Sequence, residues 1–472
     1  MREFELVIDE AFQVGLSPEE ITPFNTQVLR ECLGFKVGKL GLEAYITLDN
    51  PINPAVDMKY NWPFPQFIAG ELYNILVIRD DNGFHDLVYS VSDDHWTVTQ
   101  IADVDTLIYG QGGLMEVADF GEYIFMTNGA VIIYWNVALT AWTITAATPT
   151  IPMMKTICNF KGQAVGGNIS GVWHDCDETY YVWSKIGSID FTPDNYNEAG
   201  YRRCPYGGEV YHTKRLGDSV IGYSSKGITI ISPVTSPVPS FGFAEASDIG
   251  LINKGAMNGN LNRHIYVGED YILRELSPTS LTTERGGIKE LGYQQYMEEL
   301  AGEDIIVSYE PKEKDFYIGN STKTFLLSPK GLTEIQQHPS AVWRRDKESY
   351  MLPAAIDIFS PLISTSIFDM GYKGQKTVFT VETDALLNVE PEVSVDWAND
   401  LIMWGYGSYT PINNMGIASM ITSGNLFMFN LKFGSIYDIF RISYLKARYK
   451  MTDLRGIRGV YAPPPRGQIN DN

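Results

Sequence analysis

The stretch VIGYSSKGITIISP, residues 220–233, decides the fold, because two later stretches repeat its pattern. IYVGEDYILRELSP occupies residues 265–278, and FYIGNSTKTFLLSP occupies residues 316–329. In each copy a short apolar strand leads into a turn containing Gly or Ser, and a second strand ends at a Ser-Pro pair. Proline cannot donate a hydrogen bond to a sheet, so it suits a strand end.

A second repeat lies upstream. LVYSVSDDHWTVTQ, residues 87–100, and IIYWNVALTAWTITA, residues 132–146, each contain an alternating strand, a short turn and then Trp-Thr followed by β-branched residues. Units of about 40–50 residues with four short strands each are typical of a β-propeller. About six such units fit into residues 55–345. The alternative is a β-sandwich with ordinary hairpins, in which similar turns also recur.

The flanking segments differ from the repeats. Residues 1–54 are predicted to be an N-terminal arm with a helix that Ser17 caps and Pro18 starts, and a helical pattern continues through Thr26 to Cys32. Residues 346–460 contain strand-like stretches and predict a C-terminal β-sandwich or barrel-like domain. The tail, residues 461–472, is predicted to be flexible. The predicted fold class is therefore all-β.

The chain is strongly acidic. Its 472 residues carry 57 acidic and 36 basic side chains, for a formal net charge of −21. A protein that grips nucleic-acid phosphates needs a basic footprint, so this class is disfavoured. Acids near the N-terminus replace the apolar run of a signal peptide, so none is expected. The uncharged segment from Tyr123 to Met154 is interrupted by Gly, Asn, Thr and Pro, which favours strands over a membrane span.

Few residues suggest chemistry. On a strand, His174 and Cys176 would share a face and could bind a metal, but a zinc site needs three or four ligands and no partner cluster is visible. The adjacent acidic pairs at 80–81, 93–94 and 298–299 would point to opposite faces of a strand, which makes them poor acid–base pairs for a glycosidase. No nucleotide-binding or hydrolase motif is present. We therefore expect no catalytic residue, metal or cofactor.

The C-terminal region is locally basic. Lys446, Arg448 and Lys450 alternate with apolar residues, and Arg455 and Arg458 follow. This pattern predicts a strand with one basic face. The face either protects a sheet edge by its charge or forms an assembly interface with an acidic surface such as a neighbouring copy.

Four stretches resemble the tail hub or nozzle proteins of short-tailed bacteriophages, also called packaged-DNA stabilisation or tail tubular proteins. They lie in the family's order: AFQVGLSPEEITPFNTQVLRECLGF (11–35), VWSKIGSIDFTP (182–193), LGDSVIGYSSKGITIIS (216–232) and FDMGYKGQKTVFTVET (368–383). The chain departs from the family in lacking an Arg-Pro-Gly turn between Leu40 and Asn50.

This resemblance implies a non-enzymatic virion protein that is assembled in the host cytoplasm. Such proteins form a ring, commonly a homo-hexamer, below the portal and adaptor rings and beside tail fibres or tailspikes. The ring closes the head–tail channel, retains packaged DNA and conducts it during ejection without sequence-specific binding and without a membrane partner. The alternative is a propeller that binds or cleaves carbohydrate.

Overall fold

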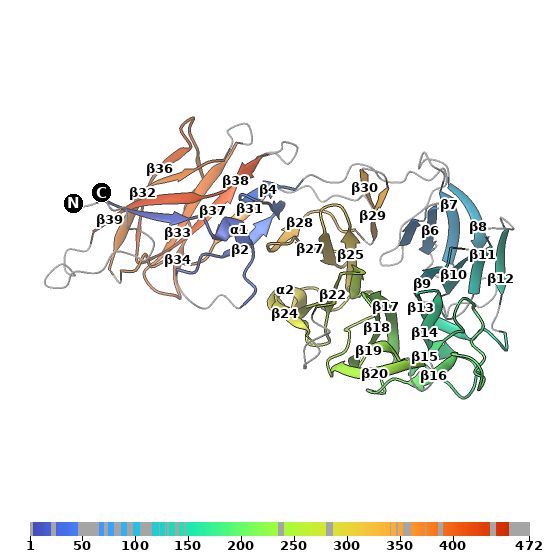
Figure 1. The fold of residues 1–472 in the computed structure, drawn as a ribbon. Coiled ribbons are helices and arrows are strands. Elements are labelled where there is room, and N and C mark those ends of the chain that lie inside the picture. Colours follow the sequence, from blue (N-terminus) through green and yellow to red (C-terminus); the bar gives the residue numbers. More distant parts are fainter. Residues whose placement is uncertain are drawn as a thin grey trace.

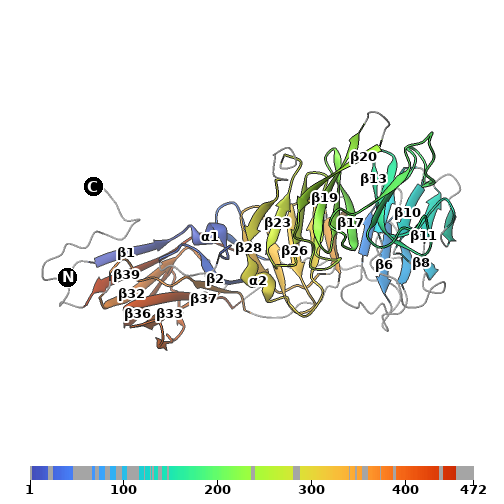
Figure 2. The same cartoon turned by 90° about the horizontal axis from the view of Figure 1, so that it is seen from below.

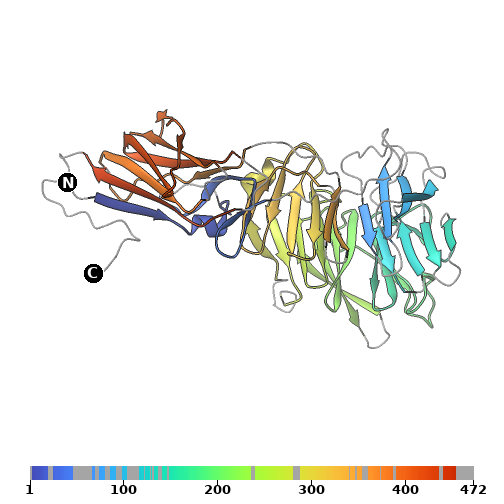
Figure 3. The same ribbon diagram turned by 90° about the horizontal axis from the view of Figure 1, so that it is seen from above.

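A computed structural model shows a chain built almost entirely of β-strands in two lobes (Figure 1). It describes residues 3–19, 25–45, 66–69, 74–79, 86–91, 98–103, 116–121, 123–127, 129, 132–136, 141–145, 148–234, 240–279, 287–339, 341–345, 348–352, 360–372, 374–385, 390–434 and 440–452. One lobe contains the central part of the chain, and the other contains strands from both ends of it. Figures 2 and 3 show the two lobes arranged along one long axis.

The first lobe contains six consecutive antiparallel groups of four strands, here called sheets 1 to 6, of which the sixth is continuous with a larger ten-stranded sheet. Sheet 1 consists of β5 (Gln66–Ala69), β6 (Asn74–Arg79), β7 (Asp86–Val91) and β8 (Val98–Asp103). Sheet 2 consists of β9 (Glu116–Asp119), β10 (Tyr123–Thr127), β11 (Ile132–Asn136) and β12 (Ala141–Thr145). Sheet 3 consists of β13 (Met153–Phe160), β14 (Gln163–Ser170), β15 (Tyr180–Trp183) and β16 (Gly200–Arg203).

The remaining sheets follow the same up-and-down order. Sheet 4 consists of β17 (Val210–Leu216), β18 (Ser219–Ser224), β19 (Gly227–Val234) and β20 (Ser240–Ser247). Sheet 5 consists of β21 (Met257–Asn260), β22 (Arg263–Val267), β23 (Leu273–Leu276) and β24 (Lys289–Gly292), and α2 (Gln294–Glu298) follows it. Sheet 6 consists of β25 (Ile306–Glu310), β26 (Asp315–Gly319), β27 (Thr324–Leu327) and β28 (Leu332–Ile335).

The sequence repeats correspond to equivalent strands. The three Ser-Pro repeats form the second and third strands of sheets 4, 5 and 6, and the Trp repeats include the third and fourth strands of sheets 1 and 2. β23 and β27 end before their Ser-Pro pairs, as predicted. Pro233 instead lies inside β19, opposite Phe241 of β20. It is tolerated because the pairing of β19 with β18 has already ended at Ile231, so no strand on that side needs its N–H.

The first strands of neighbouring sheets lie side by side. β9 contacts β13, β13 contacts β17, and β21 contacts β25. A hairpin of β29 (Ala341–Arg345) and β30 (Glu348–Leu352) follows sheet 6, and β29 contacts both β25 and β5. The hairpin therefore lies between the last sheet and the first, and it extends past the domain boundary predicted at residue 345.

The second lobe contains three sheets. The first has the order β1 (Glu3–Ile8), β39 (Leu445–Met451), β32 (Lys376–Thr383) and β36 (Ile417–Gly424). The second contains β2 (Leu29–Leu33), β31 (Leu362–Thr365), β37 (Leu426–Lys432), β33 (Glu392–Ala398), β34 (Trp404–Gly405) and β35 (Thr410–Pro411). A small sheet joins β3 (Phe35–Val37), β4 (Leu42–Ala44) and β38 (Arg441–Ile442).

The described part of the segment predicted to be an N-terminal arm lies in the second lobe. Its first strand pairs with the last described strand of the chain, with Glu3 opposite Lys450 and Ile8 opposite Leu445. The predicted helical pattern from Thr26 to Cys32 is wrong, because Leu29–Leu33 forms strand β2. This strand pairs with β28 on one side and with β31 on the other, and this pairing outweighs the local helical pattern. The segment also contains the short helix α1 (Ala11–Val14), and the helix predicted to start at Pro18 lies largely outside the described residues.

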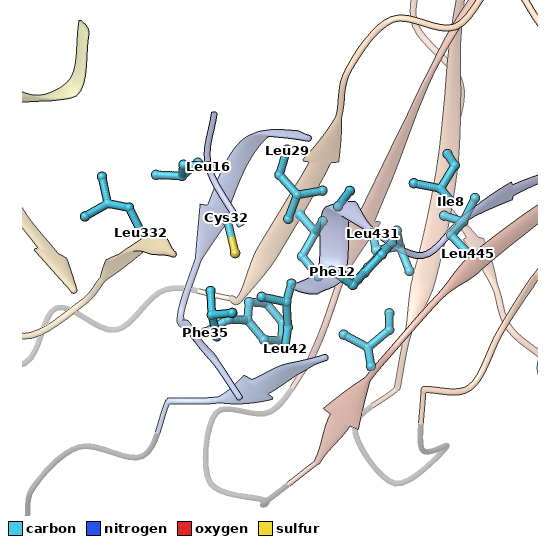
Figure 4. Close-up of a cluster of buried hydrophobic side chains, with 14 of the residues drawn as sticks. Ile8, Phe12, Leu16, Leu29, Cys32, Phe35, Leu42, Leu332, Leu431 and Leu445 are labelled. Carbon is cyan, nitrogen blue, oxygen red and sulfur yellow. The ribbon is translucent and has the colours of Figure 1, made fainter. Parts of the chain in front are cut away.

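Strand β2 also joins the two lobes. It runs parallel to β28 of sheet 6 and antiparallel to β31, so one ten-stranded sheet passes through both lobes. Leu16 N donates to Leu332 O at 2.9 Å. The approach is close enough that a Cβ on Gly331 would lie 1.7 Å from Val14 O. Figure 4 shows the shared apolar core, in which Phe12, Leu29 and Phe35 lie among side chains of both lobes.

Strands account for the uncharged segment from Tyr123 to Met154, which contains β10, β11, β12 and the start of β13. The expectation of strands there is confirmed. In the part of the chain that the structure describes, neither helix has the length and apolar character needed to cross a bilayer.

Candidate functional site

The basic strand predicted near the C-terminus is β39, and its cations have partners within the chain. Lys450 Nζ lies 3.0 Å from Glu3 Oε1, and Arg448 Nε lies 3.2 Å from Glu5 Oε1. Both Lys446 and Arg448 also reach a carboxylate of β32. The alternate residues of β39, Leu445, Ala447 and Tyr449, are buried as the pattern predicts.

The acidic partners come from the strands on either side of β39. Glu3 and Glu5 lie on β1, and Glu382 lies on β32. The basic face is therefore neutralised largely within the lobe, which the sequence reasoning missed. The alternation of Glu3 with Glu5 was the available signal, because it complements the spacing of the basic residues. Arg455 and Arg458 lie outside the described residues. A role of these five residues in assembly stays a prediction.

A partly buried charged cluster lies on and beside the first strands of sheets 2, 3 and 4. The Glu116 carboxylate of β9 lies 2.6 Å from His212 Nδ1 of β17. The other ring nitrogen of His212 contacts the backbone carbonyl of Lys254. Lys254 Nζ in turn donates to Lys155 O at 2.9 Å, and Lys155 Nζ donates to Glu209 Oε1 at 3.2 Å. These contacts tie three sheets together through polar side chains.

The electrostatics of this cluster favour an ionised Glu116. Burial alone would raise the pKa of its carboxyl group, but His212, Lys254 and Lys214 together hold this pKa below its usual value. Burial lowers the pKa of the Lys214 ammonium, and Lys214 Nζ donates to Asn258 Oδ1 of β21 at 2.9 Å. Each charge is compensated by its neighbours, so the geometry favours a structural role that holds successive sheets in place.

The candidate metal ligands do not converge. His174 and Cys176 lie on a turn, where His174 and Asp175 have φ angles of 48° and 56°, so the expectation of a shared strand face is wrong. His174 is exposed and stacks near Tyr201, whereas Cys176 is buried and its Sγ contacts His174 O at 3.7 Å. No group of three His, Cys, Asp or Glu side chains able to hold a metal ion occurs in the described ranges.

Two further surface features have unusual composition. The segment from Asn399 to Met415 contains one charged residue, Asp400, and its hairpin end exposes Leu401, Ile402 and Met403. On the other lobe, the outermost strand of sheet 3 exposes Tyr201, Arg202 and Arg203. Sequence reasoning missed both, because exposure depends on the tertiary fold.

Comparison with known proteins finds only remote likeness. No protein-family model and no curated protein matches the chain. Among solved structures, a chain of a mitotic checkpoint complex is similar at 12% identity and a TM-score of 0.38, covering 63% of this chain and 91% of that one.

Two bacterial structures are also similar. PorZ, a surface component of the type-IX secretion system of Porphyromonas gingivalis, is similar at 10% identity and a TM-score of 0.36, covering 65% of this chain and 36% of that one. The extracellular domain of a putative one-component system from B. thetaiotaomicron is similar at 10% identity and a TM-score of 0.43, covering 84% of this chain and 47% of that one.

Proposed function

We propose that this protein is a ring-forming structural subunit of a short phage tail, a hub or nozzle that closes the head–tail channel and conducts DNA on infection. The proposal rests first on the four sequence stretches that resemble this family in order. The structural observation that supports it best is a series of six four-stranded sheets attached to a β-lobe built from both ends of the chain. This order along the chain supports an arm, a propeller and a C-terminal domain in which the arm and the C-terminal domain share one lobe.

We infer that the six sheets form the blades of a propeller. The side-by-side contacts of successive first strands support this arrangement, as does the position of the β29–β30 hairpin between sheet 6 and sheet 1. In this arrangement the hairpin is a small partial blade that closes the circle. The charged cluster around Glu116 and His212 then braces the inner strands of three blades.

The mechanism is mechanical and electrostatic. A channel that conducts DNA must not hold the phosphates, because each neutralised phosphate adds affinity and slows passage. An acidic protein with a net charge of −21 meets this requirement through repulsion. The protein has partners in portal and adaptor rings and in tail fibres or tailspikes, and it needs neither a cofactor nor a catalytic residue.

Native mass spectrometry and negative-stain imaging of the full-length chain, alone and with the tail adaptor, test the proposal. We expect a closed ring that stacks coaxially on the adaptor. A chain that stays monomeric with the adaptor and binds or cleaves glycans on an array would refute the proposal and support the carbohydrate-directed alternative.

A further inference from the structure

The hairpin end between β33 and β34 presents a preorganised apolar surface, formed by Leu401, Ile402, Met403 and Tyr406 and here called the apolar tip. Leu401 is 60% exposed, Ile402 88%, Met403 76% and Tyr406 81%. The conformation is held locally, because Asp400 Oδ1 accepts hydrogen bonds from the backbone N–H groups of Ile402 at 3.0 Å and Met403 at 2.9 Å. The backbone of the tip is therefore already ordered, so less backbone entropy is lost when this surface binds a partner.

The apolar tip is large enough to contribute most of one side of an interface. A large side chain has on the order of 150–250 Å² of surface, so the four exposed fractions correspond to roughly 500 Å². A standard protein interface buries about 800 Å² on each partner. An apolar patch of this size is at the upper end of what a monomeric protein exposes, and such patches are often functional.

A surface of complementary chemistry lies on the other lobe. The outer strand β16 contributes Tyr201, Arg202 and Arg203, here called the basic edge. Val172, on the turn between β14 and β15, is 98% exposed. The Tyr201 ring packs 5.8 Å from the Trp173 ring and 5.7 Å from the His174 ring, which fixes its position.

The two arginines of the basic edge differ in their surroundings. Arg203 Nε donates to Thr179 Oγ1 at 3.1 Å, whereas the Arg202 guanidinium lies over the Phe243 ring at 4.9 Å. Within the described ranges, neither arginine forms an ion pair with a carboxylate, unlike the cations of β39. The pKa of the Asp177 carboxyl is lowered by its hydrogen bond with Thr179 and by the charge of Arg203, so the charge of Arg203 is partly compensated within the chain. The Arg202 guanidinium has no carboxylate within ion-pair distance in the described ranges.

We propose that the apolar tip of one copy of this chain docks on the basic edge of the next, with Asp400 facing Arg203 and the apolar side chains covering Val172 and Tyr201. Charge disfavours the two symmetric alternatives, because tip against tip would bring two copies of Asp400 together and edge against edge would oppose arginines. Figure 1 shows β34 and β16 at opposite ends of the molecule, so the contact forms only between molecules. Contacts of this head-to-tail kind generate rings when their rotation closes.

The inference rests on the proposed ring and names the surfaces that build it. A lipid bilayer is the other conceivable partner of an apolar tip. The observations favour protein, because Asp400 lies directly beside the apolar side chains and would have to enter the lipid with them.

Sedimentation velocity on the full-length chain over a range of concentrations tests the contact. We expect Ile402→Glu to weaken self-association at least tenfold, as for a central interface residue. The matched control is Ile421→Glu on β36, which is 85% exposed and should leave association within twofold of wild type. Arg203→Gln should weaken association, whereas Arg202→Gln should not. Unchanged thermal unfolding verifies that each variant folds.

Disulfide trapping tests the polarity of the contact. The four native cysteines are all buried, so introduced thiols dominate the reaction. We expect chains with Ile402→Cys to crosslink to chains with Val172→Cys in a mixture and not to crosslink among themselves. Efficient crosslinking of Ile402→Cys chains to one another would overturn the head-to-tail arrangement.

The remaining outcomes separate the two proposals. If wild type forms rings that Ile402→Glu and Arg203→Gln leave intact, this docking is wrong while the proposed function stands. If wild type stays monomeric at every concentration and with the adaptor, both fail. If Ile402→Glu instead abolishes binding to phosphatidylcholine vesicles and leaves association unchanged, the tip is a lipid anchor and the docking is wrong.

Discussion

Reversing the charge of Arg448, on the basic face of β39, distinguishes a role of this face within the chain from a role in assembly. Arg448 is 40% exposed and contacts Glu5 Oε1 at 3.2 Å and Glu382 Oε2 at 3.5 Å. A partly exposed ion pair contributes about 0.2–1 kcal/mol. Arg448→Glu replaces both attractions with repulsions, so we expect the free energy of unfolding to fall by about 1–2 kcal/mol.

The matched rescue is the double variant Glu5→Arg with Arg448→Glu, which restores opposite charges across β1 and β39. We expect it to recover part of the lost stability, because the Arg–Glu pair is restored in the opposite direction. The glutamate introduced at position 448 still faces Glu382, and the arginine introduced at position 5 faces Lys446, whose Nζ lies 3.5 Å from Glu5 Oε1 in the wild type. Urea unfolding followed by circular dichroism gives both values, and repetition at 0.5 M NaCl should reduce the difference because salt screens exposed pairs.

The same variants bear on the predicted assembly interface. If the pairs act within the chain, the double variant should assemble like wild type. If Arg448→Glu instead unfolds at the wild-type urea concentration, the intrachain reasoning is refuted. Loss of assembly in both variants would then establish the docking role predicted from the sequence.

Three further predictions concern the fold. Gly331→Ala places a methyl group against the carbonyl oxygen of Val14, so it should destabilise the junction of the lobes by about 3 kcal/mol and split one calorimetric transition into two. The control Gly171→Ala, at φ +82° in open space, should cost only about 1–2 kcal/mol. A single unshifted transition in Gly331→Ala would contradict the tight junction. Burial lowers the pKa of His264 to about 3, so between about pH 6.5 and 3 the unfolded chain binds a proton at this residue and the native state does not. The free energy of unfolding should therefore fall as the pH drops, by about 2 kcal/mol between pH 6.5 and 5. Urea titrations at the two pH values check this, and a pH slope unchanged in His264→Gln would count against it. Arg274 is buried and donates to both carboxylate oxygens of Asp270 at 2.7 and 2.6 Å, so Arg274→Met should lower the melting temperature by several degrees, whereas an unchanged melting curve would show that the pair is dispensable.

Much of the strand content could be read from local patterns. Period-two alternation and the Ser-Pro repeats identified equivalent strands in sheets 4 to 6, because the two faces of a strand leave that pattern in any sequence. The alternation of Lys446, Arg448 and Lys450 with buried residues also located β39 and its basic face. The repeats and strand-like stretches predicted the all-β fold class, and the residue counts showed the strong negative charge.

The tertiary structure decided everything that depends on distant partners. Glu3 meets Lys450, and Glu116 meets His212, across separations that no local pattern encodes. Leu29–Leu33 forms a strand because it pairs with β28 and with β31, and this pairing outweighs its helical pattern. Local physics thus determined which residues extend and which face is apolar. Strand pairing, side-chain burial and the exposure of Ile402 depend on which surfaces meet in the folded chain, so local patterns do not predict them.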